Sequence, residues 1–289
     1  MTQFPIKELP SEEFPALLKE INDPPEKLYI QGTLPRPETK LLCIVGSRKY
    51  TNYGKEACEK LVAGLRGYDI AIISGLALGI DSIAHKSALE AGLKTVSVPG
   101  SGLDSRVLYP KNNIQLSQKI LSSGGALLSE FDPMFKATIW SFPQRNRIMA
   151  GMSHATLIIE AELKSGTLIT SKLATEYNRD VFTVPGSIFS PTSAGPHMLL
   201  RLGATPITSS EDLLQALSFK TEGNEKTSAE KYADCSPEEM KIVELLLNPM
   251  SRDALLNESG FDISQTNAVL SMMEIKGLIV ERMGEVRLV

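Results

Sequence analysis

The sequence predicts an α/β protein in which a large domain built on a parallel sheet precedes a small α+β domain. Short apolar runs of four or five residues alternate with amphipathic helical stretches between residues 39 and 220, which is typical of βαβ units. A different pattern, three helical stretches followed by two short strands, fills residues 236–289. The length of 289 residues suits one large and one small domain.

The predicted strands of the large domain are six apolar runs, residues 41–45, 70–74, 95–98, 126–129, 156–160 and 181–184. Amphipathic stretches at 55–65 and 83–91 are two of its predicted helices. Right-handed crossovers between parallel strands place helices on both faces of the sheet and the carboxyl ends of the strands at one edge. Functional residues are therefore expected at that edge.

The sequence divides into four predicted segments. Residues 1–38 are expected to be a leader that packs on the core domain, residues 39–220. Residues 221–235 are polar and nearly free of large aliphatic side chains, which predicts a linker. Residues 236–289 form the last segment.

The last segment has the signals of a winged helix. Ser236 and Pro237 predict the start of a helix that runs to about residue 247. Ser251 opens a second helix, and Asp262 or Ser264 opens a third that runs to residue 276. Gly277 ends that helix, and residues 278–282 and 286–289 flank a turn as a hairpin. Three helices and a terminal hairpin predict a winged helix-turn-helix.

The composition excludes several classes of protein. Hydrophobic residues are 42% and charged residues 22% of the chain, as in ordinary globular proteins and unlike disordered ones. No apolar run approaches the roughly 20 residues of a membrane helix, and the amino terminus lacks the order of a signal peptide. The scattered Cys43, Cys58 and Cys235 exclude a disulfide framework and a cysteine-rich zinc site. We therefore expect a cytoplasmic protein.

The net charge of the whole chain is −4, which by itself argues against a nucleic-acid partner. The charge is not evenly distributed along the chain, however. Residues 39–220 hold 19 Lys and Arg against 14 Asp and Glu, whereas residues 236–289 hold 5 against 9. The core domain is therefore basic, and the winged helix is acidic.

Small-residue turns follow several of the predicted strands. Gly46, Ser47 and Arg48 follow the first strand, and Ser74 and Gly75 close the second. Such turns expose backbone N–H groups at helix starts, where anions bind. Near the second turn, Asp81 is expected to cap a helix and His85 to be packed rather than catalytic.

Later loops carry cations, aromatic rings and hydroxyls. Tyr109 and Lys111 follow the third strand, in a loop that lacks the third glycine of a dinucleotide fingerprint, so a nicotinamide site is disfavoured. Further on come Phe142, Arg145, Asn146 and Arg147, then Ser165, Gly166 and Thr167. The two arginines suit phosphate oxygens or internal bracing, and we expect at least one to brace loops.

The sequence shows no cluster of metal ligands and no recognisable Ser/His/Asp order. The predicted edge is therefore a phosphate-binding site without a catalytic residue, a metal or a cofactor.

These motifs in this order resemble the DNA-processing protein A (DprA/Smf) family of bacteria. The resemblance covers residues 14 to about 206. It rests on Phe14-Pro15-Ala16-Leu17-Leu18, Gly46-Ser47-Arg48, Ser74-Gly75-Leu76-Ala77 with Gly79-Ile80-Asp81, Tyr109-Pro110, Phe142-Pro143 with Arg145-Asn146-Arg147, and Ser165-Gly166-Thr167-Leu168-Ile169-Thr170.

The resemblance implies an extended Rossmann-like core that binds single-stranded DNA and loads the RecA recombinase during natural transformation. It also implies a homodimer through that core and a basic pocket lined by Arg48 and Lys111. Some members carry an extra amino-terminal helical module, which we do not expect here because the leader motif lies close to the start of the sequence. Together with the strand-end loops, this predicts the following DNA-binding residues: Gly46, Ser47, Arg48, Ser74, Gly75, Tyr109, Lys111, Phe142, Arg145, Asn146, Arg147, Ser165, Gly166 and Thr167.

Two alternatives come from other classes of protein. A nucleotide phosphoribohydrolase of the related lysine-decarboxylase-like group would need a PGGxGT segment, which neither Pro99-Gly100-Ser101-Gly102 nor Ser165-Gly166-Thr167 matches. A transcription regulator would read duplex DNA through the winged helix. The acidic charge of that domain opposes this reading, because it repels phosphates.

Overall fold

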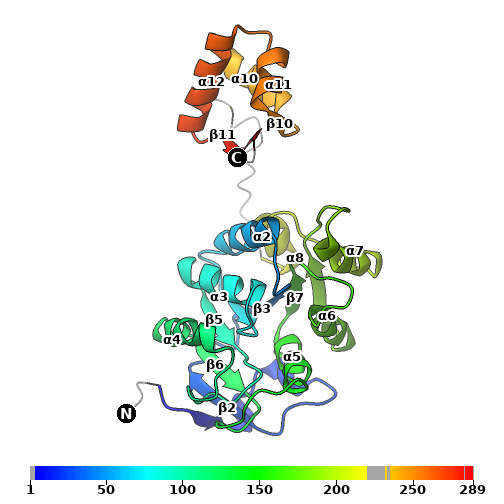
Figure 1. Cartoon of the computed structure of the whole chain (residues 1–289). Coiled ribbons are helices and arrows are strands. Elements are labelled where there is room, and N and C mark those ends of the chain that lie inside the picture. The colour runs from blue at the N-terminus through cyan, green and yellow to red at the C-terminus, as the bar shows by residue number, and fades with distance from the viewer. Residues whose placement is uncertain (1–3, 220–231, 233–234, 283, 289) are drawn as a thin grey trace. The chain divides into compact units, whose positions relative to one another are not determined.

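The computed structural model describes residues 4–219, 232, 235–282 and 284–288. The chain divides into two compact units, residues 1–220 and 221–289 (Figure 1), and each has its own hydrophobic core. The predicted linker, residues 221–235, lies outside the described residues except for Tyr232 and Cys235.

A nine-stranded sheet forms the centre of the first unit, in the order β1-β2-β6-β5-β4-β3-β7-β8-β9. Strands β3 to β9 pair in parallel, and the six predicted strands are present with ends shifted by at most two residues. The bounds are β1 (Lys7–Leu9), β2 (Leu28–Gly32), β3 (Lys40–Val45), β4 (Ile70–Ser74), β5 (Lys94–Ser97), β6 (Ala126–Ser129), β7 (Ala155–Ile158), β8 (Asp180–Thr183) and β9 (Thr205–Pro206).

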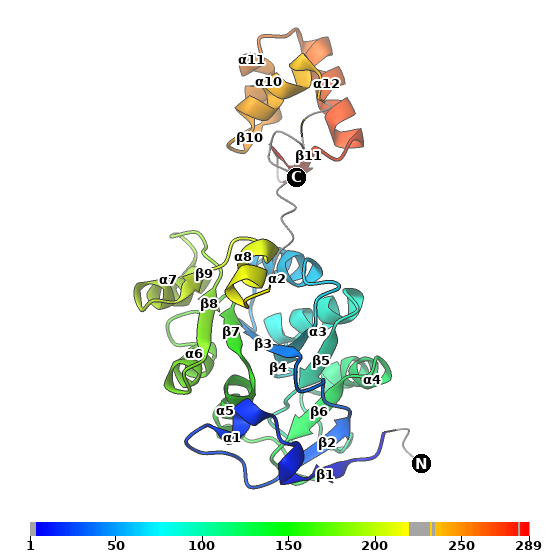
Figure 2. The same ribbon diagram turned by 180° about the vertical axis from the view of Figure 1, so that it is seen from behind.

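Helices cover both faces of this sheet (Figures 1 and 2). Side chains of α2, α3 and α8 pack against one face, and those of α1, α5 and α7 pack against the other. The bounds are η1 (Ser11–Glu13), α1 (Ala16–Lys19), α2 (Asn52–Ala63), α3 (Ile80–Glu90), η2 (Lys111–Asn113), α4 (Ile114–Ser122), α5 (Ser141–Met152), α6 (Thr167–Glu176), η3 (Pro191–Ser193), α7 (Ala194–Arg201) and α8 (Ser210–Ala216).

The leader, residues 1–38, adds two strands that the sequence analysis did not predict. β1 pairs with β2, and β2 pairs with β6, both antiparallel. Leu28 and Ile30 alternate with less buried residues on β2, and they join Phe14 and Leu18 in one of the two large core clusters. The leader is thus part of the same sheet and core as the parallel strands.

The strand order reverses at β3. From β3 the chain adds β4, β5 and β6 on one side, and it then crosses to place β7, β8 and β9 on the other. The loops after β3 and β7 lead to elements on opposite sides of the sheet and leave a crevice at the carboxyl ends of the strands, where ligands of such sheets bind.

The second unit has the predicted winged-helix elements. Ser236 caps the first helix through a capping box with Glu239, Asp262 caps the third, and Gly277 follows it with φ +70°. A short strand that the sequence analysis missed joins the hairpin in the order β10-β12-β11. The bounds are α10 (Pro237–Leu245), β10 (Met250–Ser251), α11 (Arg252–Glu258), α12 (Ile263–Ile275), β11 (Ile279–Arg282) and β12 (Glu285–Leu288).

Within the described part of the chain, no helix is long and apolar enough to span a membrane.

Candidate nucleic-acid interface

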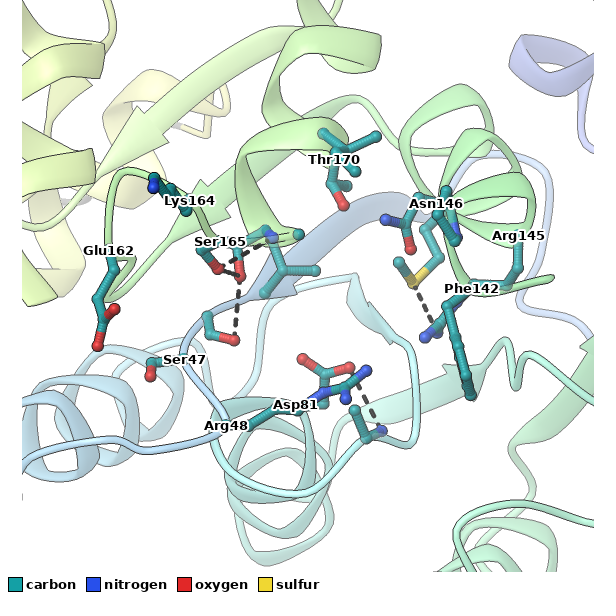
Figure 3. A pocket seen from close by; sticks show the side chains of 18 of the residues that line it. Ser47, Arg48, Asp81, Phe142, Arg145, Asn146, Glu162, Lys164, Ser165 and Thr170 are labelled. Carbon is teal, nitrogen blue, oxygen red and sulfur yellow. Dashed lines mark hydrogen bonds between the residues drawn. The ribbon is translucent and has the colours of Figure 1, made fainter. Parts of the chain in front are cut away.

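A pocket of about 610 Å³ occupies the crevice where the strand order reverses (Figure 3). The loops after β3 and β7, the start of α3, one side of α5 and the start of α6 surround it. Its lining residues are Val45, Gly46, Ser47, Arg48, Lys49, Ala77, Asp81, Ile139, Phe142, Pro143, Arg145, Asn146, Met149, Glu162, Lys164, Ser165, Gly166, Thr167, Ile169 and Thr170.

Hydrogen bonds and a close backbone contact hold the loop that carries Arg48. The backbone N–H of Ile80 donates to the carbonyl of Ser47 at 3.2 Å. Gly79, with φ +88°, lies so close that a Cβ there would meet the Ser47 oxygen at 2.4 Å. Glu160 is buried and accepts from the N–H and the hydroxyl of Thr51 at 2.9 and 2.6 Å. These contacts fix the loop while the Arg48 side chain remains exposed.

The loop after β7 contributes hydroxyl and amide groups to the opposite wall. Ser165 accepts from the backbone N–H of Thr167 at 3.2 Å, and the Thr167 hydroxyl donates to the carbonyl of Gly46 at 3.2 Å. Gly166 and Thr167 start α6, so the positive end of its dipole lies at the pocket. This wall suits an anion.

The floor of the pocket holds a buried arginine and a buried carboxylate. Arg145 is 4% exposed; its guanidinium donates to the carbonyl of Val98 and contacts the Met149 sulfur at 3.4 Å. Asp81 accepts from the N–H groups of Gly75 and Ala77 at 3.1 and 3.4 Å. Burial raises the pKa of Asp81, whereas the charge of Arg145 and the two amides lower it.

Asp81 does not cap α3, contrary to the sequence-based expectation. The residue at the cap position is Gly79. Asp81 lies in the first turn of the helix, and its carboxylate turns back to bind the amides of the preceding loop. His85 is packed, as expected: it is buried, with Nδ1 2.7 Å from the Thr95 hydroxyl.

Aromatic rings lie beside the exposed cation. The Arg48 guanidinium carbon lies 5.5 Å from the centre of the Phe142 ring, within the range of a cation–π contact. The ring of Tyr109, which is about half exposed, lies 5.6 Å from that of Phe142. A cation and two rings therefore occupy adjoining surface at the pocket.

Nine of the fourteen predicted site residues line the pocket, and three others are engaged in contacts within the protein. Ser74 is wholly buried and donates to the Ile44 carbonyl at 2.6 Å, and Gly75 is covered by Arg145. The guanidinium of Arg147 lies outside the pocket lining and is bound by Glu130 and by the leader residue Asp23. All three make contacts that hold the fold together, and their expected contact with DNA stays a prediction.

Two further predicted residues lie beyond the pocket lining. Tyr109 reaches the pocket only through Phe142. Lys111 is exposed at the start of η2, and Asn113 ties that turn to the loop after β4 by donating to the Leu76 carbonyl at 2.7 Å.

Several lining residues were not among those predicted from the sequence. Lys49 and Lys164 are exposed cations, each adjacent in sequence to a predicted residue, so the loop motifs signalled them. Thr170 belongs to the quoted motif that begins at Ser165, whereas Ile139 carried no such signal. Glu162 adds an exposed carboxylate to the rim. Among the described residues, no group of three or more His, Cys, Asp or Glu is placed to hold a metal ion.

Comparison with known proteins assigns the family. The family model of DNA recombination-mediator protein A matches residues 7–218, and that of the DprA winged helix domain matches residues 226–285. The chain belongs to the DNA processing protein A family. It is 40% identical over 217 residues to the DNA processing protein DprA of Streptococcus pneumoniae, which covers 75% of this chain and 76% of that protein.

A second relative and a solved structure give the extent of the likeness. Protein Smf of Escherichia coli is 39% identical over 209 residues, which are 72% of this chain but only 55% of the relative. The crystal structure of S. pneumoniae DprA matches with a TM-score of 0.68 at 39% identity, covering 74% of each chain.

A Helicobacter pylori DNA processing protein A also matches, with a TM-score of 0.66, 32% identity and coverage of 75% of this chain and 97% of that one. Its structure is described as showing a unique single-stranded DNA binding mode.

Proposed function

We propose that this protein binds single-stranded DNA without sequence preference at the pocket between β3 and β7. The observation that carries the proposal is the combination of exposed Arg48, Lys49 and Lys164 with the adjoining rings of Phe142 and Tyr109. Cations that follow the phosphates and rings on which bases stack are the two components of sequence-tolerant single-strand binding. The single-stranded DNA binding described for the H. pylori relative supports it.

The expected contacts divide by chemistry. Arg48 and the amide groups at the start of α6 would hold phosphate oxygens, and Phe142 would stack against a base. Arg145 stabilises the floor beneath them. No step of this function requires a bond to be made or broken.

Fluorescence anisotropy of labelled oligonucleotides tests the proposal. The protein should bind a single strand more tightly than the corresponding duplex, because duplex bases are not free to stack. The logarithm of the affinity should fall by about 0.7 per logarithmic unit of salt for each neutralised phosphate. Equal affinity for duplex, or affinity independent of salt, would refute it.

We further propose that the protein loads RecA on the bound strand during natural transformation and acts in the cytoplasm as a dimer through the first unit. Its family membership supports this proposal. Substoichiometric protein should stimulate RecA-dependent strand pairing on DNA coated with single-strand-binding protein. Inhibition at every ratio would identify a passive binder, and light scattering at a monomer mass across working concentrations would exclude the dimer.

A nucleotide phosphoribohydrolase activity at the same pocket has a separate test. Release of free base from nucleoside monophosphates, measured by chromatography, would establish it. Unchanged nucleotides are the expected result.

A further inference from the structure

The segment that joins β6 to α5 exposes large apolar side chains beside the pocket. Ile139 is 91% exposed, Trp140 54% and Met134 46%. Ile139 lines the pocket itself, and Phe142 follows two residues after Trp140. We call Met134, Phe135, Ile139 and Trp140 the Trp140 ledge. Exposed apolar surface that continues a binding site marks an interaction surface more often than chance.

Aromatic contacts position the indole of Trp140. Phe131 is buried, and the Phe135 ring stacks on it at 4.6 Å with an interplanar angle of 18°. The indole lies 5.8 Å from the Phe131 ring at 76° and 5.5 Å from the Phe135 ring at 60°. Neither ring therefore lies parallel over a face of the indole.

Hydrogen bonds hold the ledge against the loop after β5. The N–H of Gly102 donates to the Phe135 carbonyl at 2.9 Å, and that of Asp104 donates to the Pro133 carbonyl at 3.0 Å. The Ser141 hydroxyl donates to the Gly100 carbonyl at 2.6 Å. A Cβ on Gly102 would meet the Pro133 oxygen at 2.4 Å, so the two segments are in close contact. Because the surface is already ordered, less conformational entropy of the protein is lost when a ligand binds there.

The charged side chains around the Trp140 ledge indicate which kind of ligand it binds. Arg48, Lys49 and Lys164 are exposed at the adjoining pocket, and Lys136 is exposed on the same segment as the ledge. A ligand that is flat and apolar in one part and anionic in the next fits this surface, and a nucleotide strand has that alternation. A purely apolar partner would leave the cations without counter-charges.

We propose that the Trp140 ledge is a second stacking platform, on which an unpaired base next to the nucleotide at Arg48 and Phe142 stacks against Trp140. This inference rests on the proposed function. It extends the strand's path from the pocket onto the segment before α5, where base stacking contributes affinity and no phosphate is neutralised.

Trp140 is the single tryptophan of the chain, so its fluorescence reports this contact directly. The whole protein is titrated with an oligothymidylate and with an abasic strand of equal length, and binding is followed independently by competition anisotropy. The thymine strand should quench the fluorescence in parallel with binding. The abasic strand should bind through its phosphates with little quenching.

Substitution separates stacking from charge. Trp140→Ala should weaken single-strand binding about five- to tenfold, the lower part of the range for loss of one base–aromatic stack, and should leave the salt slope unchanged. Trp140→Phe should retain most of the affinity. Leu247→Ala is the matched control, because Leu247 is an exposed apolar side chain of the second unit. Circular dichroism verifies that each variant is folded.

The outcomes distinguish this inference from the proposed function. If anisotropy shows binding of the thymine strand but the tryptophan fluorescence is not quenched, stacking on Trp140 is refuted. Full affinity in Trp140→Ala refutes it as well. Either result leaves the proposed binding at the pocket intact. No binding of any strand overturns the proposed function itself. A fluorescence change that follows protein concentration without DNA would show that a second copy covers the ledge, which also overturns the inference.

Discussion

Removing the carboxylate of Asp81 should destabilise the first unit without removing its affinity for DNA. Asp81 and Arg145 are both buried, and their charges act on each other. Asp81→Ala leaves the arginine without a nearby counter-charge and deprives the amides of Gly75 and Ala77 of their acceptor. Leaving such buried polar groups unsatisfied costs about 1–3 kcal/mol.

Asp81→Asn separates the two contributions. The amide oxygen of Asn keeps an acceptor for the loop amides, so this variant should lose less than Asp81→Ala. The double variant Asp81→Asn, Arg145→Met removes both charges, and replacing a buried pair with groups of similar size is often neutral. It should therefore be more stable than the sum of the single losses predicts, by about 0.5–3 kcal/mol.

Urea unfolding followed by circular dichroism measures these free energies, and anisotropy measures DNA affinity in the absence of urea. A loss below about 1 kcal/mol for Asp81→Ala, within the range of an ordinary surface change, would refute a stabilising role for this carboxylate. Additive losses in the double variant would show that the two charges do not interact. A large loss of affinity in folded Asp81→Asn would place this carboxylate in the binding site instead.

Three further predictions concern binding and one concerns pH. Arg48→Ala should weaken binding to all single strands and flatten the salt slope by about 0.7, as one lost phosphate contact requires; an unchanged slope by anisotropy would contradict it. Lys111→Ala should act more weakly in the same titration, because Lys111 lies outside the pocket lining and its charge lacks a bidentate fork. A chain truncated after residue 219 should keep most of its affinity, because the winged helix is acidic; loss of binding by a folded truncated chain would assign DNA contacts to the second unit. Burial lowers the pKa of His85 from 6.5 to about 3. Between pH 6.5 and about pH 3, His85 is therefore protonated in the unfolded chain and neutral in the folded chain. The free energy of unfolding should fall as pH falls through that window, by at most about 1.4 kcal/mol per pH unit from this group. A parallel decline in folded His85→Gln would contradict this origin.

The sequence by itself determined the parallel strands and the winged helix, because both depend on local signals. Alternation of apolar runs and amphipathic stretches identified the strands β3 to β8. Ser236, Asp262 and Gly277 marked helix ends through capping and left-handed backbone geometry, which operate within a few residues. The antiparallel β1 and β2 were missed because β1 has only three residues and β2, Leu28–Gly32, is not a continuous apolar run.

The sequence also located the loops of the site, since the carboxyl ends of parallel strands share one edge. It did not determine the role of each cation in those loops. Arg48, Arg145 and Arg147 look alike as residues of basic loops, and the sequence left open which of Arg145 and Arg147 braces the loops.

Only the tertiary structure separated these arginines, because the partner of each comes from a distant part of the chain. Arg147 is bound by Glu130 and by Asp23 of the leader. Arg145 is buried and donates a hydrogen bond to the carbonyl of Val98. Arg48 stays exposed against Phe142. Burial and ion pairing depend on which segments pack together, and no local pattern records that.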